Sequence, residues 1–230
     1  MIDIHSHLLP LVDDGSASIE SSIRRLKDAQ NSGVTDIILT PHYKSGYRKT
    51  PQELREIFSK FNEEKIKQNV SVNLYLGNEI LYGKNTRKTL KEQNVLTLNG
   101  TKFVLIEFDY FNVTDVTEVV YGLVRDGFTP IVAHVERYSY VSIGDIAEMK
   151  NLGGLIQVNA SSFVGECSLR LKRRVKKLFK EDLVDFVASD EHVDRKNNLQ
   201  LAKDYVTKKF GSETATRVFV ENAKKIIGQA

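Results

Sequence analysis

Cysteine is nearly absent from this chain, which has only one among its 230 residues. A single cysteine excludes an internal disulfide framework and is typical of a reducing compartment, so we expect a cytoplasmic protein. No segment approaches the roughly 18 consecutive apolar residues that a membrane-spanning helix needs. Charged residues appear from Asp3 onward, where a signal peptide would become apolar. We therefore expect no membrane insertion.

An excess of charge of one sign is also missing. The 33 basic and 30 acidic residues leave a formal net charge of +3, whereas nucleic-acid binding usually needs a concentrated basic surface. Linkers, low-complexity runs and internal repeats are absent as well. The 41% of hydrophobic residues are enough for a sizeable core. We therefore expect one domain over residues 1–230 and no nucleic-acid partner.

What the sequence does contain is an alternation of strand-like and helix-like segments. Short apolar runs typical of buried strands occur at residues 1–4, 36–40, 70–76, 103–106, 130–133, 154–158 and 184–188. Apolar residues recur at helical spacing over residues 18–32, 51–68, 86–93, 113–125, 168–180, 199–210 and 212–227. Continuous apolar strands that alternate with helices predict an α/β fold with a parallel sheet.

Both a doubly wound sheet and a barrel of about seven strands would satisfy this pattern, but the polar residues favour the barrel. The five histidines follow predicted strands and are His5, His7, His42, His134 and His192. Carboxylates stand at equivalent points, namely Glu79, Glu107 and Asp190, with Asp14 on the first loop. In a barrel these strand ends surround one mouth, where active sites form. The sequence therefore predicts a metal site with several ions at the C-terminal ends of the strands.

The first fourteen residues show which metals would suit such a site. His5 and His7 are two apart on a predicted strand, so their side chains point the same way. Asp13 and Asp14 precede Gly15, which is expected to form a turn. Imidazole and carboxylate together suit zinc, manganese or iron better than calcium or magnesium. No cysteine is nearby, which argues against a structural zinc site.

Several short motifs together resemble the polymerase and histidinol phosphatase (PHP) superfamily. They are His5-Ser-His7, Asp13-Asp-Gly15, Thr40-Pro-His42, Gly77-Asn-Glu79, Glu107, His134-Val-Glu-Arg137 and Ser189-Asp-Glu-His192. Within this superfamily the chain most resembles the bacterial manganese-dependent tyrosine-protein phosphatases of capsule and exopolysaccharide operons, in order and over essentially its full length. The resemblance implies a distorted seven-stranded (β/α) barrel. Leu11 and Val12 stand where the family commonly has a glycine, which affects the expected loop shape and not the ligands.

The resemblance also implies which residues bind metal. His5, His7, Glu79 and Asp190 would hold one ion. Glu79 would bridge to a second ion, held also by Glu107 and His134. Asp14, His42 and His192 would hold a third. The implied cofactor is Mn²⁺, with up to three divalent ions per chain and with iron or zinc as alternatives.

Three basic residues are candidates for contact with the substrate. By resemblance, Arg137 is the catalytic residue that would reach the phosphate, and the alternative is a surface salt bridge with Glu136. The family varies in the basic residues around the third histidine motif, so Lys44 and Arg48 are further candidates for substrate binding.

The chemistry expected from these parts is hydrolysis of a phosphate ester. Metals bridged by Glu79 can lower the pKa of a bound water and clamp the phosphate, and Arg137 can add a charge-assisted contact. The leading hypothesis is a protein-tyrosine phosphatase that acts on an autophosphorylating bacterial tyrosine kinase of capsule or exopolysaccharide synthesis. One alternative is a phosphatase for histidinol phosphate or another small phosphomonoester. The other is a non-catalytic module that binds phosphotyrosine or nucleic acid.

Three further features each allow two interpretations. Cys167 and Arg173 have the Cys-x5-Arg spacing of thiol-based phosphatases, but the residues between them lack glycine and have helical spacing, which favours a chance match. The basic run over residues 170–180 is either a solvated helix face or a docking surface for an acidic phosphorylated tail. Aromatic residues near the predicted mouth either stack on phosphotyrosine or belong to the core, namely Phe108, Tyr110, Phe111, Tyr138 and Tyr140.

Overall fold

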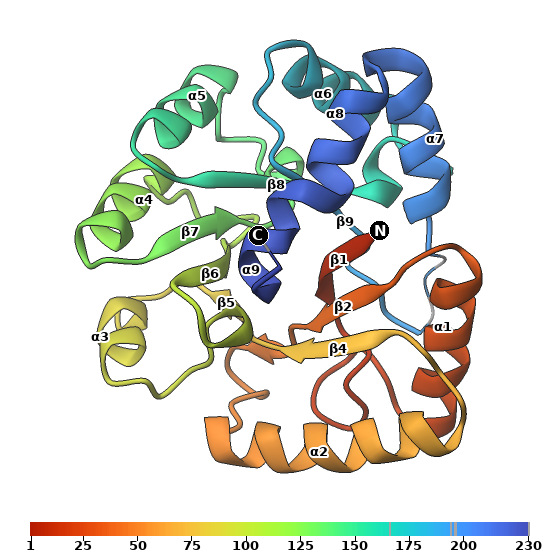
Figure 1. The fold of residues 1–230 in the computed structure, drawn as a ribbon. Coiled ribbons are helices and arrows are strands. Elements are labelled where there is room, and N and C mark those ends of the chain that lie inside the picture. Colours follow the sequence, from red (N-terminus) through yellow and green to blue (C-terminus); the bar gives the residue numbers. More distant parts are fainter. Residues whose placement is uncertain (166, 194, 196, 230) are drawn as a thin grey trace.

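A computed structural model describes residues 1–165, 167–193, 195 and 197–229 (Figure 1). These residues form the strands β1 (Ile2–Ser6), β2 (Asp36–Leu39), β3 (His42–Tyr43), β4 (Asn73–Leu76), β5 (Glu79–Leu81), β6 (Phe103–Glu107), β7 (Thr129–Val132), β8 (Leu155–Asn159) and β9 (Phe186–Ala188). All described strand pairs are parallel, in the orders β1-β2-β4 and β3-β5-β6-β7-β8-β9. The predicted α/β class and parallel sheet are confirmed, but the described residues form nine strands rather than seven.

The two sheets follow one another closely along the chain. Only Thr40 and Pro41 separate β2 from β3, and only Gly77 and Asn78 separate β4 from β5. At the other end, Ser6 of β1 forms a parallel bridge with Glu191, just beyond β9. The result is a strongly curled parallel sheet with helices around its outside (Figure 1).

The helices begin where the sequence provides caps. Their bounds are α1 (Ile19–Asn31), α2 (Pro51–Lys67), α3 (Thr86–Lys91), α4 (Val116–Arg125), α5 (Ile143–Asn151), α6 (Leu169–Lys180), α7 (Leu199–Phe210), α8 (Ser212–Thr216) and α9 (Asn222–Ile227), with short turns η1 (Leu98–Gly100), η2 (Val135–Arg137), η3 (Ala160–Ser162) and the π-type turn η4 (Arg217–Glu221). Helix α2 has a capping box between Thr50 and Glu53 and places proline at its first position.

Three helical segments differ from the prediction. The helix expected over residues 212–227 is divided by the π-type turn η4 into α8 and α9. Helix α4 begins at Val116 rather than Val113, because the Asp115 carboxylate accepts a hydrogen bond from the Glu118 N–H at 3.0 Å and caps the helix there. Helix α5 was not predicted, although Ser142 and Asp145 form a capping box at its start.

The core has two parts. The larger part lies between the sheet and the outer helices. The smaller part includes Ile4, Leu105, Ile131 and Phe186 from the strands, packed with Ile226 of α9. Helix α9 lies over the centre of the curled sheet in Figure 1, on the side where the strands begin. The strands end on the opposite side of the sheet, which α9 does not cover. None of the described helices is long and apolar enough to cross a membrane.

Candidate metal centre

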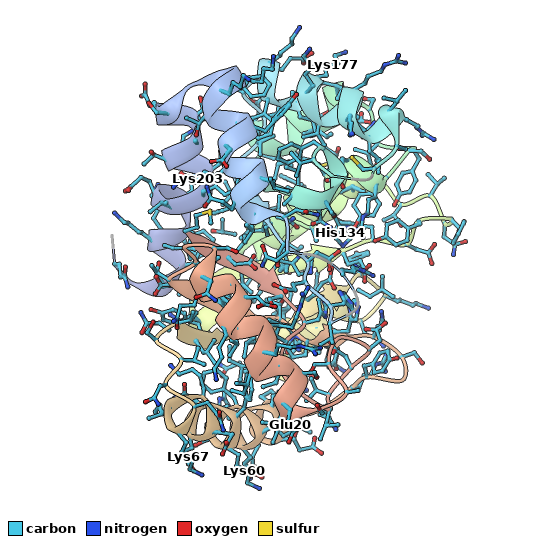
Figure 2. All side chains as sticks on the ribbon, turned by 90° about the vertical axis from the view of Figure 1, so that its right-hand side faces the viewer. Glu20, Lys60, Lys67, His134, Lys177 and Lys203 are labelled. Carbon is cyan, nitrogen blue, oxygen red and sulfur yellow. The ribbon has the colours of Figure 1, made fainter. Side chains whose placement is uncertain are left out.

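The nine residues predicted to bind metal lie together where the strands end. Their ligand atoms form four overlapping groups: His5, His7 and Asp190; His5, Glu79 and His134; His42, Glu79 and Glu107; and His7, Asp14, His42 and His192. Within each group the atoms lie within 4.8 Å of one another. Figures 1 and 2 together place His134 toward the face opposite α9.

Glu79 is the centre of this cluster. Its carboxylate oxygens lie 3.2 Å from His5 Nε2, 2.8 Å from His42 Nδ1 and 2.9 Å from His134 Nε2. Glu79 is 1% exposed, and burial by itself would raise its pKa. The neighbouring histidines, His5 first, outweigh burial and hold the pKa of Glu79 well below its usual value. A buried carboxylate shared among several imidazoles is suited to bridge more than one cation.

The grouping differs in several respects from the one that the family resemblance implies. His7 also joins the group of Asp14, His42 and His192, and Glu79 is not grouped with His7 and Asp190. Glu107 was expected beside Glu79 and His134, but it groups with Glu79 and His42. The nearest oxygens of Glu107 lie 3.8 Å from both His42 Nδ1 and His134 Nε2. Burial, and then the charge of Glu79, raises the pKa of Glu107 to about 7. Two carboxylates this close in a buried site call for positive charge between them.

Asp14 lies at the outer edge of the cluster. Its side chain is 47% exposed, and Oδ1 lies 3.5 Å from His42 Nε2 and 3.7 Å from His192 Nε2. His42 therefore has one ring nitrogen toward Asp14 and the other toward Glu79. It connects the exposed and the buried groups of ligand atoms.

Asp13 orients two of these histidines. Its Oδ2 lies 2.8 Å from His7 Nδ1 and accepts a hydrogen bond from the His42 N–H at 2.9 Å. The Asp13 contact leaves His7 Nε2 directed at the cluster. Gly15 completes this turn, because a Cβ atom there would lie 2.1 Å from the His7 carbonyl oxygen. The Asp-Asp-Gly motif therefore supplies one candidate ligand, one orienting carboxylate and one close backbone approach.

Gln157 and Asn159 of β8 orient the opposite side, and sequence reasoning missed both. Gln157 Oε1 lies 3.2 Å from His5 Nδ1 and accepts a hydrogen bond from the His134 N–H at 2.9 Å. Its Nε2 donates to Asn159 Oδ1 at 2.7 Å, and Asn159 Nδ2 donates to Asp190 at 2.7 Å. Both side chains are completely buried. The available signal was a glutamine inside an otherwise apolar strand, two residues before its polar end.

Two candidate ligands stand on unusual backbone. His134 has φ 33° and Asp190 has φ 50°, both in the left-handed region that favours glycine. Hydrogen bonds hold these residues there, from the His134 N–H to Gln157 and from the Asp190 N–H to the His5 carbonyl at 3.0 Å. Strained residues held in this way are typical of functional sites.

The donor set fits divalent transition metals. His5 Nε2 and His7 Nε2 face each other at 3.1 Å. His42 Nδ1 and Glu79 Oε2 lie 2.8 Å apart but lack hydrogen-bond alignment, and both buried atoms have no hydrogen-bond partner among the described residues. Converging, unpartnered nitrogen and oxygen atoms are expected where cations complete the site.

Arg137 lies beside the cluster and is not paired with Glu136. Its Nη1 lies 3.2 Å from Asp190 Oδ2 and 3.4 Å from the Tyr110 hydroxyl, and its side chain is 28% exposed. Glu136 is buried and accepts a hydrogen bond from the Asn159 N–H at 3.0 Å. The surface salt bridge considered as an alternative is therefore wrong for the described residues.

Lys44 and Arg48 lie farther from the cluster. Lys44 Nζ is 3.9 Å from Asp14 Oδ2 and 5.5 Å from the centre of the Tyr47 ring. Arg48 is exposed and stacks on Tyr43 at 5.8 Å. Of the two, only Lys44 touches a candidate ligand in the described part of the chain.

Cys167 is not part of this site. Its pKa is raised by burial, which opposes a reactive thiolate. Arg173 is exposed on the basic helix α6, which begins at Leu169 with Ser168 as its cap. The segment between Cys167 and Arg173 is therefore mostly helix and not a phosphate-binding loop, as the chance-match interpretation predicts.

The chain matches the family described as "Capsular polysaccharide synthesis, CpsB/CapC" over residues 1–228. It is 34% identical over 240 residues to the tyrosine-protein phosphatase CpsB of Streptococcus agalactiae serotype V, covering 99% of this chain and 98% of that protein. It is 33% identical over 234 residues to the tyrosine-protein phosphatase YwqE of Bacillus subtilis, covering 99% and 91%.

A solved structure also matches the whole chain. It comes from work on YwqE from Bacillus subtilis and CpsB from Streptococcus pneumoniae, described as unique metal-dependent tyrosine phosphatases. The TM-score is 0.93 at 31% sequence identity, and the match covers 100% of this chain and 96% of that one.

Proposed function

The chain belongs to the CpsB/CapC family of capsular polysaccharide synthesis, and from this membership we propose that it is a metal-dependent protein-tyrosine phosphatase whose centre is the cluster around Glu79. The resemblance drawn from the sequence motifs is thereby confirmed. The observation that carries the proposal is the convergence of nine candidate metal ligands, with the guanidinium of Arg137 beside them.

The residues proposed to hold divalent ions are the nine of the cluster. Glu79 would be shared between ions, because three histidines surround it within 3.2 Å. When bound, such ions activate water as a nucleophile near neutral pH and neutralise charge on phosphoryl oxygens. Mn²⁺ is our proposal for the ion, supported by the mixed imidazole and carboxylate donors. More than one ion per chain is expected, since nine ligands exceed what one ion uses.

Arg137 is proposed to bind the phosphoryl oxygens. Its guanidinium has no lone pair to offer a metal, but it donates in a planar fork that suits phosphate. Asp190 and Tyr110 both contact its Nη1. The charge of Asp190 outweighs burial and raises the pKa of Arg137, so the guanidinium stays charged. Hydrolysis of the ester then releases tyrosine, whose free pKa of about 10 makes it a comparatively good leaving group.

The finer features of the fold and the biology are proposed with this function. Counting β2 with β3, and β4 with β5, gives the seven-stranded distorted barrel expected of the PHP type, as one domain over residues 1–230. The proposed substrate is a phosphorylated bacterial tyrosine kinase of capsule synthesis, supported by the family description. The single cysteine is compatible with the cytoplasm, which we propose as the compartment.

The test is metal analysis combined with turnover of a phosphotyrosine peptide. We expect more than one transition-metal ion per chain, release of phosphate from the peptide, and loss of this activity after chelation. The Cys167→Ser variant serves as a control and should retain turnover, because water and not a thiolate is the nucleophile. Hydrolysis of small alkyl phosphomonoesters but not of the peptide would contradict the proposal. Full activity with a single bound ion would contradict the polynuclear centre.

A further inference from the structure

The aromatic residues near the mouth fall into two groups. Phe108 and Tyr138 are 1% and 0% exposed and belong to the core. Tyr110 and Phe111 are 37% and 92% exposed and belong to the loop that follows β6, which also carries Val113, 79% exposed. Tyr140 is half-buried against the core. The core interpretation therefore holds for Phe108, Tyr138 and Tyr140 and fails for Tyr110 and Phe111.

The base of this loop is attached to the catalytic cluster. The Tyr110 hydroxyl lies 3.3 Å from Glu107 Oε1 and 3.5 Å from His134 Nδ1, and it accepts a hydrogen bond from Arg137 at 3.4 Å. The Tyr110 ring also packs against Tyr138, with 5.6 Å between ring centres. Tyr110, which directly precedes Phe111, thus forms one edge of the proposed phosphate site.

The tip of the loop is held outward. The Asp109 carboxylate accepts hydrogen bonds from the N–H groups of Phe111 at 2.7 Å and Asn112 at 2.9 Å. The Tyr140 hydroxyl donates to the Asp109 carbonyl at 2.9 Å. These contacts fix the backbone on both sides of Phe111, while its ring remains in solvent.

Exposed apolar residues are usually scattered singly, whereas neighbouring ones mark binding sites. Ile66, Tyr121 and Leu201 are such isolated residues, each on a different helix. Tyr110, Phe111 and Val113 instead lie within four positions and continue from the metal cluster. A phosphotyrosine bound at Arg137 would place the residues beside it in the substrate chain against this loop.

We propose that the loop Asp109–Thr114 is the peptide-recognition surface of the enzyme, in which Phe111 and Val113 bind an apolar side chain next to the phosphotyrosine. The inference rests on the proposed phosphatase function and adds a substrate preference to it. Tyr110 connects the two sites, because it contacts Arg137 on one side and carries Phe111 on the other.

The test compares two phosphotyrosine peptides that differ only in one flanking residue, leucine or serine, with free phosphotyrosine as a substrate that lacks flanking residues. The wild-type enzyme should have a kcat/KM about tenfold higher for the leucine peptide, from partial burial of one apolar side chain. Phe111→Ser should remove most of this preference, mainly through KM, and Phe111→Leu should restore it. Tyr121→Ser removes an exposed aromatic side chain from α4 and serves as the matched control, with the preference intact.

Equal kcat/KM values for the two peptides in the wild-type enzyme would overturn the inference. So would a Phe111→Ser variant that loses activity equally on the peptides and on free phosphotyrosine, because that loss would be structural. Turnover of the phosphotyrosine peptides by the wild-type enzyme in either case keeps the proposed function, which fails if the wild-type enzyme does not hydrolyse them.

Discussion

Arg137 and His134 are three residues apart but are expected to do different work. His134 lies among the metal-binding atoms, and burial lowers its pKa to about 4, so it is neutral and available as a ligand near pH 7. Arg137 faces the same site with a permanent charge and no lone pair. We therefore expect His134 to bind metal and Arg137 to bind the substrate.

Arg137→Ala should lower kcat/KM by roughly two or more orders of magnitude, as expected for loss of one strong electrostatic contact in a transition state. Its metal content should stay near that of the wild type. His134→Ala should lower both metal occupancy and rate. Metal analysis and kinetics on the two variants separate these roles. Equal metal loss in both variants would mean that the arginine is structural, and an unaffected rate would move phosphate binding toward Lys44.

Gln157 is expected to act on the metals through the histidines that it holds. Gln157→Leu removes the acceptor for His5 Nδ1 and the His134 N–H while keeping a similar volume. Loss of such an orienting contact typically weakens metal binding by about 10- to 100-fold. Competition with a chelator measures this. Gln30→Leu is the matched control, since Gln30 accepts a hydrogen bond from the Ser71 N–H on the outside of the fold. Equal affinity in the two variants would exclude an orienting role for Gln157.

At the scale of elements, the basic helix α6 is only partly a solvated face. Arg174 Nη2 donates to the Val141 carbonyl at 2.5 Å and the Tyr138 carbonyl at 3.2 Å. These carbonyls belong to the segment directly after Arg137. Arg173, which precedes Arg174 on α6, is exposed. One cation of the run, Arg174, therefore anchors the segment next to Arg137, the proposed catalytic arginine.

Arg174→Ala should lower the free energy of unfolding by about 1.5–3 kcal/mol, the usual effect of losing hydrogen bonds from a charged donor. It should also reduce kcat/KM, because the segment after Arg137 loses its anchor. Arg173→Ala removes the same charge from the next position and should change stability by less than about 0.5 kcal/mol. Denaturant unfolding measures the free energy of unfolding of the two variants, and steady-state kinetics measures kcat/KM. Similar losses in the two variants would show that only the total charge of α6 matters.

The sequence predicted most elements because their signals are local. Thr50, Pro51 and Glu53 mark the start of α2 within four residues. Helix α5 was missed because it has only Ile146 and Met149 as buried residues, too few for a clear helical period. The short strands β3 and β5 were read as strand ends, because each has fewer than four residues.

The candidate ligands were predictable because each follows an apolar strand, and strand ends meet at one mouth. Their outer partners were not. Asp13, Gln157 and Asn159 act through contacts between residues far apart in the sequence, such as the 152 positions between His5 and Gln157. Sheet curvature and register determine which polar residue of a strand faces which histidine. A local sequence pattern predicts neither of them.

For the molecule as a whole, metal binding should depend on pH. In the metal-free protein, the charges of Glu79 and Asp190 outweigh burial and raise the pKa of His5 above its ordinary value of 6.5. Hydrogen bonds from the protonated His7 ring to the Asp13 and Glu79 carboxylates likewise outweigh burial and raise the pKa of His7 well above 6.5. Protons therefore compete with metal at these positions, and they compete more strongly as the pH falls.

The apparent dissociation constant for Mn²⁺ should therefore increase between pH 8 and pH 6, with release of protons on binding. Calorimetric titration in two buffers of different ionisation enthalpy measures both quantities. Metal addition should also raise the thermal midpoint of the chelated protein, because buried carboxylates gain a counter-charge. A dissociation constant that does not change with pH would show that His5 and His7 are not ligands.

The segments that follow β1 and β9 meet at the cluster, although they lie far apart in the sequence. The Ser189 N–H donates to Asp3 at 3.0 Å across 186 positions of sequence, and the His7 N–H donates to the Glu191 carbonyl at 2.9 Å. During synthesis on a ribosome, the first two histidines emerge long before Asp190 and His192 exist. The complete centre can therefore form only after nearly the whole chain has been made, and its closure carries the entropic cost of a very long loop. We therefore expect metal to bind late in biogenesis, and a chain truncated before Asp190 should not become an active phosphatase.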